Sequence, residues 1–130
     1  MATITRFEDL EIWQIAKELC REVFIISTKT SLKNDFKLRD QINGSSGSVM
    51  DNIAEGFERD GKNEFRQFLS ISKGSCGETR SQLYRVFDRK YISQEKFEEI
   101  KKITIVLSKK ISSFINYLNK SNYKGTKYKT

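Results

Sequence analysis

The sequence predicts an all-α protein, an antiparallel up-down-up-down four-helix bundle. The 130 residues contain no proline, the residue that interrupts a helix by removing a hydrogen-bond donor. Apolar residues recur at spacings of three and four along four long segments, which is the period of one helix face. The connections between these segments are short, so consecutive helices should lie side by side and antiparallel. We assign residues 1–120 to this bundle.

The first helix is expected from about Glu8 to Lys29, with a polar connector up to Asn34. One apolar stripe follows its length, and further apolar residues widen that stripe, as in a helix that contacts two neighbours. The stripe comprises Leu10, Trp13, Ala16, Cys20 and Val23, and Leu19, Phe24 and Ile26 widen it.

The second helix is expected from about Asp35 to Glu55. Its middle is formed by Gly44, Ser45, Ser46, Gly47 and Ser48. Each glycine in a helix interior costs roughly 1 kcal/mol, so we interpret this small-residue segment as a place where a neighbouring backbone comes close.

The end of the second helix carries a candidate structural motif, Asn52, Glu55 and Gly56. Gly56 is expected just past the C-terminus, where glycine is the usual residue. Asn52 lies on or beside the apolar seam and needs hydrogen-bond partners if it is buried. Glu55 and Arg59 could supply them; alternatively, Asn52 and Glu55 lie only at the rim of the interface.

The third and fourth helices are expected from about Asn63 to Arg89 and from about Gln94 to Asn119. The third helix also has small residues in its middle, Gly74, Ser75 and Gly77. Two adjacent helices with such centres predict a tightly packed antiparallel hairpin. Ser93 is expected to be the N-cap of the fourth helix.

The composition argues against several kinds of active site. The chain has no histidine, which removes the commonest general base, the usual zinc ligand and the Glu-x-x-His motif of di-iron bundles. The GSSGS segment lies inside a helix and lacks the Gly-Lys-Ser/Thr of a P-loop. We therefore expect no enzyme, no cofactor and no metal. Cys20 and Cys76 lack a C-x-x-C spacing and are expected as buried free thiols rather than a disulfide.

The sequence also shows no features of a targeting signal or a membrane span. The N-terminal residues lack the basic and apolar regions of a signal peptide, and no apolar run approaches the ~20 residues of a membrane span. A cytoplasmic protein without membrane contact is expected.

The formal net charge is +7, and this positive charge is concentrated at the C-terminus. Residues 121–130 lack helical periodicity and are expected to form a basic tail that is disordered or only partly ordered. An excess of positive charge favours an anionic partner, nucleic acid first. Alternatively, the charge only keeps a small domain in solution.

Basic residues also recur at a spacing of seven, which keeps side chains on nearly one face of a helix. Arg59, Arg66, Lys73 and Arg80 follow this spacing, Lys62 extends the stripe, and Lys102 and Lys109 repeat it on the fourth helix. A stripe of this kind can follow a phosphate backbone through non-specific ion pairs. Alternatively, it is an ordinary solvated face.

Three motifs carry a family resemblance. They are Phe7-Glu8-Asp9-Leu10-x-x-Trp13, Asn52-Ile53-Ala54-Glu55-Gly56-Phe57, and Phe68-Leu69-x-Ile71-x-x-Gly74-Ser75. With them, the chain from about Phe7 to Leu118 resembles the bacterial four-helix bundle proteins encoded in 23S ribosomal RNA intervening sequences, once labelled S23 ribosomal proteins. Members typically show Arg-Ala-Ala where this chain has Asn43-Gly44-Ser45-Ser46, so one basic residue of the family is missing here.

The resemblance implies assembly into a homopentamer. The family is also similar to the accessory variability protein of diversity-generating retroelements, a basic pentameric barrel that works with a reverse transcriptase and nucleic acid. A reverse-transcriptase-like partner is therefore implied as well.

Residues and resemblance together lead to one functional hypothesis. The protein is expected to be a non-enzymatic, homo-oligomeric bundle that binds nucleic acid, RNA rather than DNA, with little sequence specificity through its basic faces. The alternative is a protein-interaction or scaffold module with no nucleic-acid role.

Overall fold

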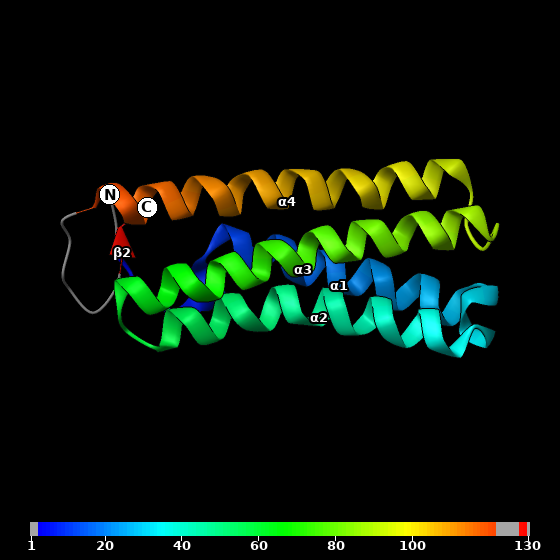
Figure 1. Cartoon of the computed structure of the whole chain (residues 1–130), viewed down its shortest axis with the longest axis horizontal. Coiled ribbons are helices and arrows are strands. Elements are labelled where there is room, and N and C mark those ends of the chain that lie inside the picture. Colours follow the sequence, from blue (N-terminus) through cyan, green and yellow to red (C-terminus); the bar gives the residue numbers. More distant parts are fainter. Residues whose placement is uncertain (1–2, 122–127, 130) are drawn as a thin grey trace.

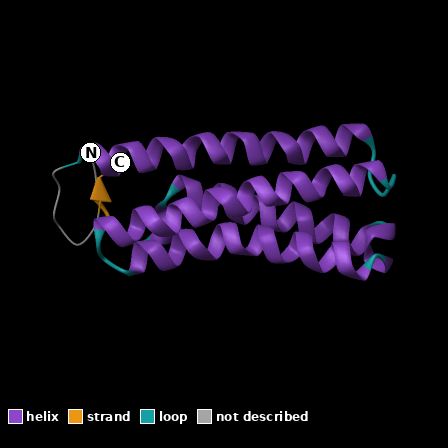
Figure 2. Ribbon diagram, in the orientation of Figure 1, coloured by secondary structure: helices purple, strands orange, loops and turns teal. Residues whose placement is uncertain are grey.

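The computed structural model describes residues 3–121 and 128–129. Its four long helices are α1 (Glu11–Lys29), α2 (Phe36–Glu58), α3 (Lys62–Asp88) and α4 (Gln94–Lys120). Figure 1 shows these helices side by side with alternating direction, and Figure 2 shows how short the connecting loops are. The predicted all-α four-helix bundle is confirmed.

The helix boundaries differ from the predicted ones at three places. Phe7–Asp9 forms a separate 3-10 helix and Leu10 is extended, so α1 begins at Glu11. The connector after α1 contains a second 3-10 helix, Ser31–Asn34. The helix α2 continues beyond Glu55 to Glu58.

Segments near the two ends of the chain form a small strand pair. Strand β1 (Thr3–Ile4) pairs antiparallel with β2 (Tyr128–Lys129), with Thr3 opposite Lys129. These two residues of the predicted tail are therefore paired with the N-terminal strand. The rest of the predicted tail beyond Ser121 lies outside the described residues.

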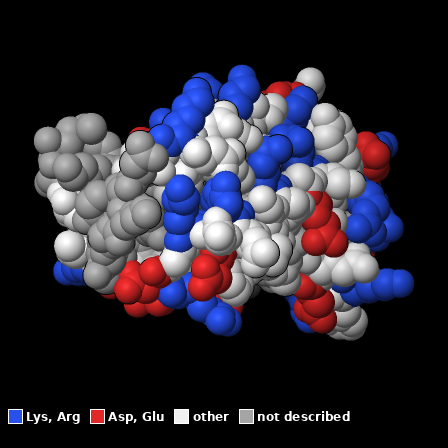
Figure 3. All heavy atoms as spheres, turned by 60° about the vertical axis from the view of Figure 1, so that its left-hand side comes forward, with Lys and Arg blue, Asp and Glu red and all other residues white. Residues whose placement is uncertain are grey.

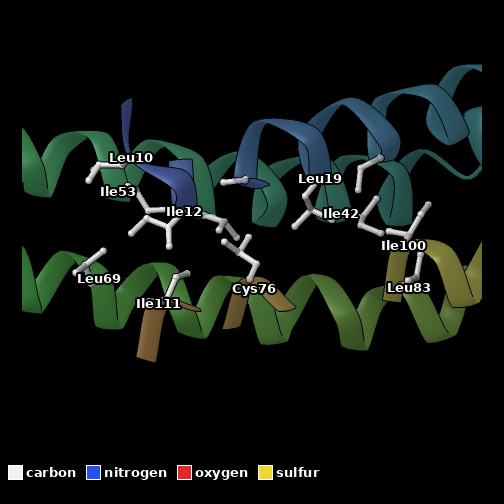
Figure 4. Close-up of a cluster of buried hydrophobic side chains, with 14 of the residues drawn as sticks. Leu10, Ile12, Leu19, Ile42, Ile53, Leu69, Cys76, Leu83, Ile100 and Ile111 are labelled. Atoms are coloured by element: carbon white, nitrogen blue, oxygen red, sulfur yellow. The ribbon is translucent and has the colours of Figure 1, made fainter. Parts of the chain in front are cut away.

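The core lies along the axis between all four helices, and Figure 4 shows its central part. The side chains labelled there come from all four helices and the residue before α1, and all are buried: Leu10, Ile12, Leu19, Ile42, Ile53, Leu69, Cys76, Leu83, Ile100 and Ile111. The predicted inward faces are largely confirmed. The prediction that Phe24 belongs to the inward face of α1 is wrong, since this side chain is 61% exposed, whereas Ile12, which the predicted stripe does not include, is buried.

Both cysteines are free thiols, as predicted. The buried Cys76 donates its Sγ–H to the Thr104 carbonyl over 3.3 Å, and Cys20 donates to the Ser46 carbonyl over 3.1 Å. Burial raises the pKa of the Cys76 thiol to about 11, and burial also raises the pKa of Cys20. Both thiols therefore stay protonated at neutral pH and act as small packing groups.

Short polar side chains hold α2 against α3. The Ser45 hydroxyl lies 2.8 Å from the Thr79 hydroxyl and donates to Oε1 of Gln82 over 2.6 Å. One turn away, the Ser48 and Ser75 hydroxyls lie 2.9 Å apart. The predicted tight hairpin is thus formed, and its serines make the contacts.

The glycines of the two helix centres do not take part in this close packing, which corrects the prediction. A Cβ added to Gly44, Gly47, Gly74 or Gly77 would meet no neighbouring atom within 4 Å, because these positions face away from the adjacent helix. The prediction rested on the small-residue composition of the two helix centres, but the serines next to the glycines occupy the interface.

Within residues 3–121, no helix combines the length and the apolar composition needed to cross a membrane.

Asp35 connects the start of α2 to the α3–α4 connection. Its Oδ1 accepts from the Leu38 amide over 3.5 Å and so caps α2. Its Oδ2 accepts from Nη1 of Arg89 over 2.6 Å and from the Tyr91 hydroxyl over 2.8 Å. These two donors, Tyr91 first, hold the pKa of the Asp35 carboxyl below its usual range.

The lowered pKa predicts a pH-dependent contribution to stability. A carboxylate whose folded pKa is depressed stabilises the fold at pH values above its unfolded pKa, and that stabilisation is lost as the pH falls through the folded pKa. Asp35→Asn should therefore unfold at a lower temperature than the unmodified protein at pH 7, and the two should converge in acid. Asn still caps a helix, so the difference reports on Arg89 and Tyr91. Thermal unfolding by circular dichroism at both pH values measures it, with Asp51→Asn on the exposed face of α2 as the matched control. A constant difference at all pH values would contradict this prediction.

Candidate nucleic-acid interface

The predicted basic stripe of α3 lies on the flank of that helix that faces α4. Arg66, Lys73 and Arg80 are seven residues apart and so share one flank. Nη1 of Arg66 donates to Oδ1 of Asn119 near the end of α4 over 2.6 Å. Nζ of Lys62 donates to the Ser121 carbonyl over 3.0 Å. These two contacts place the beginning of the stripe beside the C-terminal end of α4.

Lys101 on α4 joins this surface from the opposite side. Its Nζ lies 5.6 Å from the ring centroid of Tyr84 on α3 and 5.6 Å from that of Phe97. Lys101 was not among the predicted residues, because the spacing of seven connects Lys102 with Lys109 and Lys101 lies one position before Lys102. The available signal was Tyr84, an aromatic residue one turn after Arg80 on the same flank.

We call the outer surface formed by Arg66, Lys73, Arg80 and Lys101 the α3/α4 basic face. The positions between these cations carry small side chains, Ser70 and Gly77 on α3 and Ser108 and Ser112 on α4. A Cβ at Gly77 would meet no atom within 4 Å, so there is open space beside this position. An extended anionic chain could approach the helices closely here.

The charges of this face are not neutralised by carboxylates. The salt bridges among the described residues involve Arg6, Arg39, Arg89, Lys96 and Lys110, and none involves a member of the α3/α4 basic face. The positive charges of Arg80 and Lys73 reach the Cys76 thiol and lower its pKa, against the larger effect of burial. Figure 3 shows Lys and Arg gathered over the upper half of one side of the molecule, the half where α4 lies.

Three of the cations predicted to bind nucleic acid lie outside the α3/α4 basic face. Arg59 is the C-cap of α2, before α3 begins, and its guanidinium lies 5.2 Å from the ring centroid of Phe68; its assignment to a face of the third helix is wrong. Lys102 lines an open hollow between α1 and α4 with Glu18 and Glu99. Lys109 is exposed, and its spacing of seven from Lys102 places it on nearly the same flank of α4 as Lys102.

The structural motif is arranged differently from the prediction. Nδ2 of Asn52 donates to the carbonyl and the hydroxyl of Ser48, over 2.8 and 2.9 Å, and not to Glu55. Because Glu55 is exposed and Arg59 packs on Phe68, the network of Asn52, Glu55 and Arg59 is not formed. Gly56 is buried inside α2 and does not end the helix.

In the described part of the chain, no three His, Cys, Asp or Glu side chains gather closely enough to hold a metal ion.

Comparisons with known proteins agree with this fold. The model of the 23S rRNA-intervening sequence protein family matches residues 8–113. One similar crystal structure is that of a protein with unknown function from the S23 ribosomal protein family of Bacteroides thetaiotaomicron VPI-5482. It is 25% identical, its TM-score is 0.70, and the match covers 80% of this chain and 97% of that one. No curated protein matches significantly.

Proposed function

The chain belongs to the 23S rRNA-intervening sequence protein family, and on that premise we propose that it is a non-enzymatic, homo-oligomeric protein that binds nucleic acid. The partner is RNA rather than DNA, and the phosphate backbone is bound on the α3/α4 basic face. The relation to accessory variability proteins, with its reverse-transcriptase-like partner, stays a prediction.

One observation carries this proposal: the α3/α4 basic face presents aligned cations that no carboxylate neutralises. Lys73 is exposed and Arg80 is half-buried, and neither forms a salt bridge among residues 3–121. On an ordinary solvated helix face, carboxylates at i±4 would be expected to neutralise such cations. A phosphate backbone would supply the missing negative charge and release its own counterions.

The chemistry of this face favours backbone contacts over base reading. Sequence is read by donors and acceptors aimed at base edges, whereas lysines and arginines on phosphates fix position without reading sequence. The residues between the cations are serines and a glycine. Little sequence specificity is therefore proposed.

Assembly would strengthen such binding. Several copies that contact one nucleic acid turn later contacts into intramolecular ones, so weak individual sites add up to a high overall affinity. A homo-oligomer, a pentamer by the family resemblance, is part of this proposal. Light scattering on the purified protein measures it, and a monomer would contradict it.

Charge reversal on the face is expected to weaken binding and its salt dependence. Lys73→Glu combined with Arg80→Glu reverses two charges of the α3/α4 basic face, and neither cation has a salt-bridge partner in residues 3–121. Fluorescence anisotropy with a labelled RNA hairpin at about 50 and 200 mM salt should show strong salt dependence for the unmodified protein. For the variant, the slope should fall by about one for each phosphate that the protein no longer binds.

The matched control is Arg59→Glu combined with Arg85→Glu, because it changes the net charge equally on the other side of α3. Arg59 lies over Phe68, and Arg85 donates to Gln41 of α2. Equal decreases in affinity for the two double variants would show that only net charge matters. Absence of RNA binding at low salt would contradict the proposed function and favour a protein-interaction module. A DNA hairpin of the same sequence tests the preference for RNA.

A further inference from the structure

Two phenylalanines are exposed near the end of the bundle where α1 leads into α2, the right-hand end in Figure 1. Phe24 on α1 is 61% exposed and Phe36 at the start of α2 is 63% exposed. By contrast, Phe57, Phe65 and Phe97 are buried in the core. Full burial of such a side chain is worth roughly 1.5–3 kcal/mol, and both rings leave most of that unused.

The two rings are connected through Arg39. Its guanidinium carbon lies 4.9 Å from the ring centroid of Phe36. The same arginine lines an open hollow of about 460 Å³ together with Phe24. Arg39 is held in place by Asp40 and by the Lys33 carbonyl, to which its Nη1 donates over 3.0 Å. The hollow therefore has an aromatic wall on one side and a fixed, ring-stacked guanidinium on the other.

The hollow also presents a hydrogen-bond acceptor. Nδ2 of Asn43 donates to the Ser27 hydroxyl over 2.7 Å and to the Arg39 carbonyl over 2.8 Å. Both donors of this amide are thus engaged, and its Oδ1 accepts no hydrogen bond from the residues that the structure describes. Asn43 is half-buried and lines the hollow. An amino group on the ligand would complete its hydrogen bonding.

The charge around the hollow selects an anionic ligand. Lys33 lines it, as does the Asp40 carboxylate, and Arg21, which is not among the lining residues, lies three residues before Phe24 on the same flank of α1. Neither Lys33 nor Arg21 is in a salt bridge within residues 3–121, whereas Arg39 is paired with Asp40. Exposed rings between free cations suit an unpaired nucleotide, whose base stacks while its phosphate is neutralised. Protein–protein interfaces are enriched in phenylalanine and arginine and depleted of lysine, so Lys33 is the residue that favours a nucleotide here, and a second protein chain on the rings is an outcome that the test below distinguishes.

We propose that this hollow is a binding site for an unpaired nucleotide of single-stranded RNA. The base stacks on Phe24 or Phe36, its amino group donates to Oδ1 of Asn43, and Arg21 and Lys33 contact the adjoining phosphates. The inference rests on the proposed function and extends it, because the α3/α4 basic face holds phosphates whereas this end of the bundle holds bases. The protein would therefore favour RNA with unpaired segments over a plain duplex.

The test compares two probes that differ only in their bases. One is a labelled oligoadenylate of about 12 nucleotides, within the range of single-strand site sizes. The other is an abasic phosphodiester strand of the same length. The unmodified protein is expected to bind the oligoadenylate more tightly. Phe24→Ala and Phe36→Ala should each weaken oligoadenylate binding by at least about fivefold, the lower end for removal of one stacked base, without changing the affinity for the abasic strand.

Two control variants separate stacking from other effects. Phe36→Tyr keeps an aromatic ring and should retain the preference for bases. Ile71→Ala removes another exposed apolar side chain, 52% exposed on α3, and should bind both probes as the unmodified protein does. Because Phe24 and Phe36 are exposed, their alanine variants should fold, and circular dichroism checks this.

Three outcomes would overturn the inference. Equal affinity of the unmodified protein for the two probes would show that bases are not bound. Alanine variants that keep the full preference would place the base site elsewhere. A change of oligomeric state in these variants without a selective loss of oligoadenylate binding would show that a second copy covers the rings. In each case, salt-dependent binding of the abasic strand would leave the proposed function standing.

Discussion

Replacing Phe65 with alanine is expected to lower the free energy of unfolding by about 3–5 kcal/mol, the usual range for a buried phenylalanine. Phe65 on α3 is completely buried. Its ring centroid lies 5.8 Å from that of Phe57 on α2, edge to face, and 5.5 Å from that of Phe114 on α4. Three helices meet at this side chain, so the cavity left by its removal cannot be filled by one neighbour alone.

The measurement is urea unfolding followed by circular dichroism, at one protein concentration, because association would shift the apparent stability. Phe36→Ala is the matched control, since it is the same substitution at a ring that is 63% exposed. It should change the free energy of unfolding by no more than about 0.5 kcal/mol. Comparable decreases for both variants would contradict the assignment of Phe65 to the core and of Phe36 to the surface.

The contrast between these two phenylalanines shows what could be predicted from the sequence about the fold. Apolar periodicity predicted four helices and most of their inner faces, because packing against a common core imposes that period. It could not predict that Phe24 is exposed whereas Ile12 is buried. Residues at the edge of an apolar stripe are buried only where a neighbouring helix reaches them. Phe24 lies close to the end of α1, near the point where α2 has just begun.

The candidate interface was predictable in part for a similar reason. The spacing of seven correctly grouped Arg66, Lys73 and Arg80, because it keeps side chains on one flank wherever the helix is continuous. Arg59 shares the spacing but belongs to the previous helix, and the break between Glu58 and Lys62 removes the geometric relation. Lys101 joins the face through its contact with Tyr84, a tertiary contact that no spacing within one helix reveals.

Gly56 shows the same limit for backbone geometry. Its position near the end of the second helix predicted a C-cap, which would require the left-handed conformation that glycine adopts readily. Among the described glycines none has a positive φ, and α2 continues past Gly56 to Glu58. The reason for glycine at this position is the adjacent helix, because α3 packs directly against the backbone of α2 here.

Gly56→Ala is therefore expected to lower the free energy of unfolding by about 1–3 kcal/mol, the usual cost of overpacking. A Cβ at this position would lie 2.5 Å from Cβ of Phe68 and 3.1 Å from Cδ1 of Phe65. The Cβ of Phe68 is fixed to its backbone and cannot rotate away, so α2 and α3 would have to separate. The higher helix propensity of alanine, worth up to about 1 kcal/mol, offsets only part of this cost.

Gly44→Ala is the matched control, since it is the same substitution in the same helix at a position where a Cβ would meet nothing within 4 Å. There the gain in helix propensity acts alone, so the free energy of unfolding should rise by up to about 1 kcal/mol. Urea unfolding of the two variants should thus give changes of opposite sign. A gain in stability for Gly56→Ala would contradict the close approach of α2 and α3 at Gly56. A decrease in stability for Gly44→Ala would show that a neighbouring helix also comes close at Gly44.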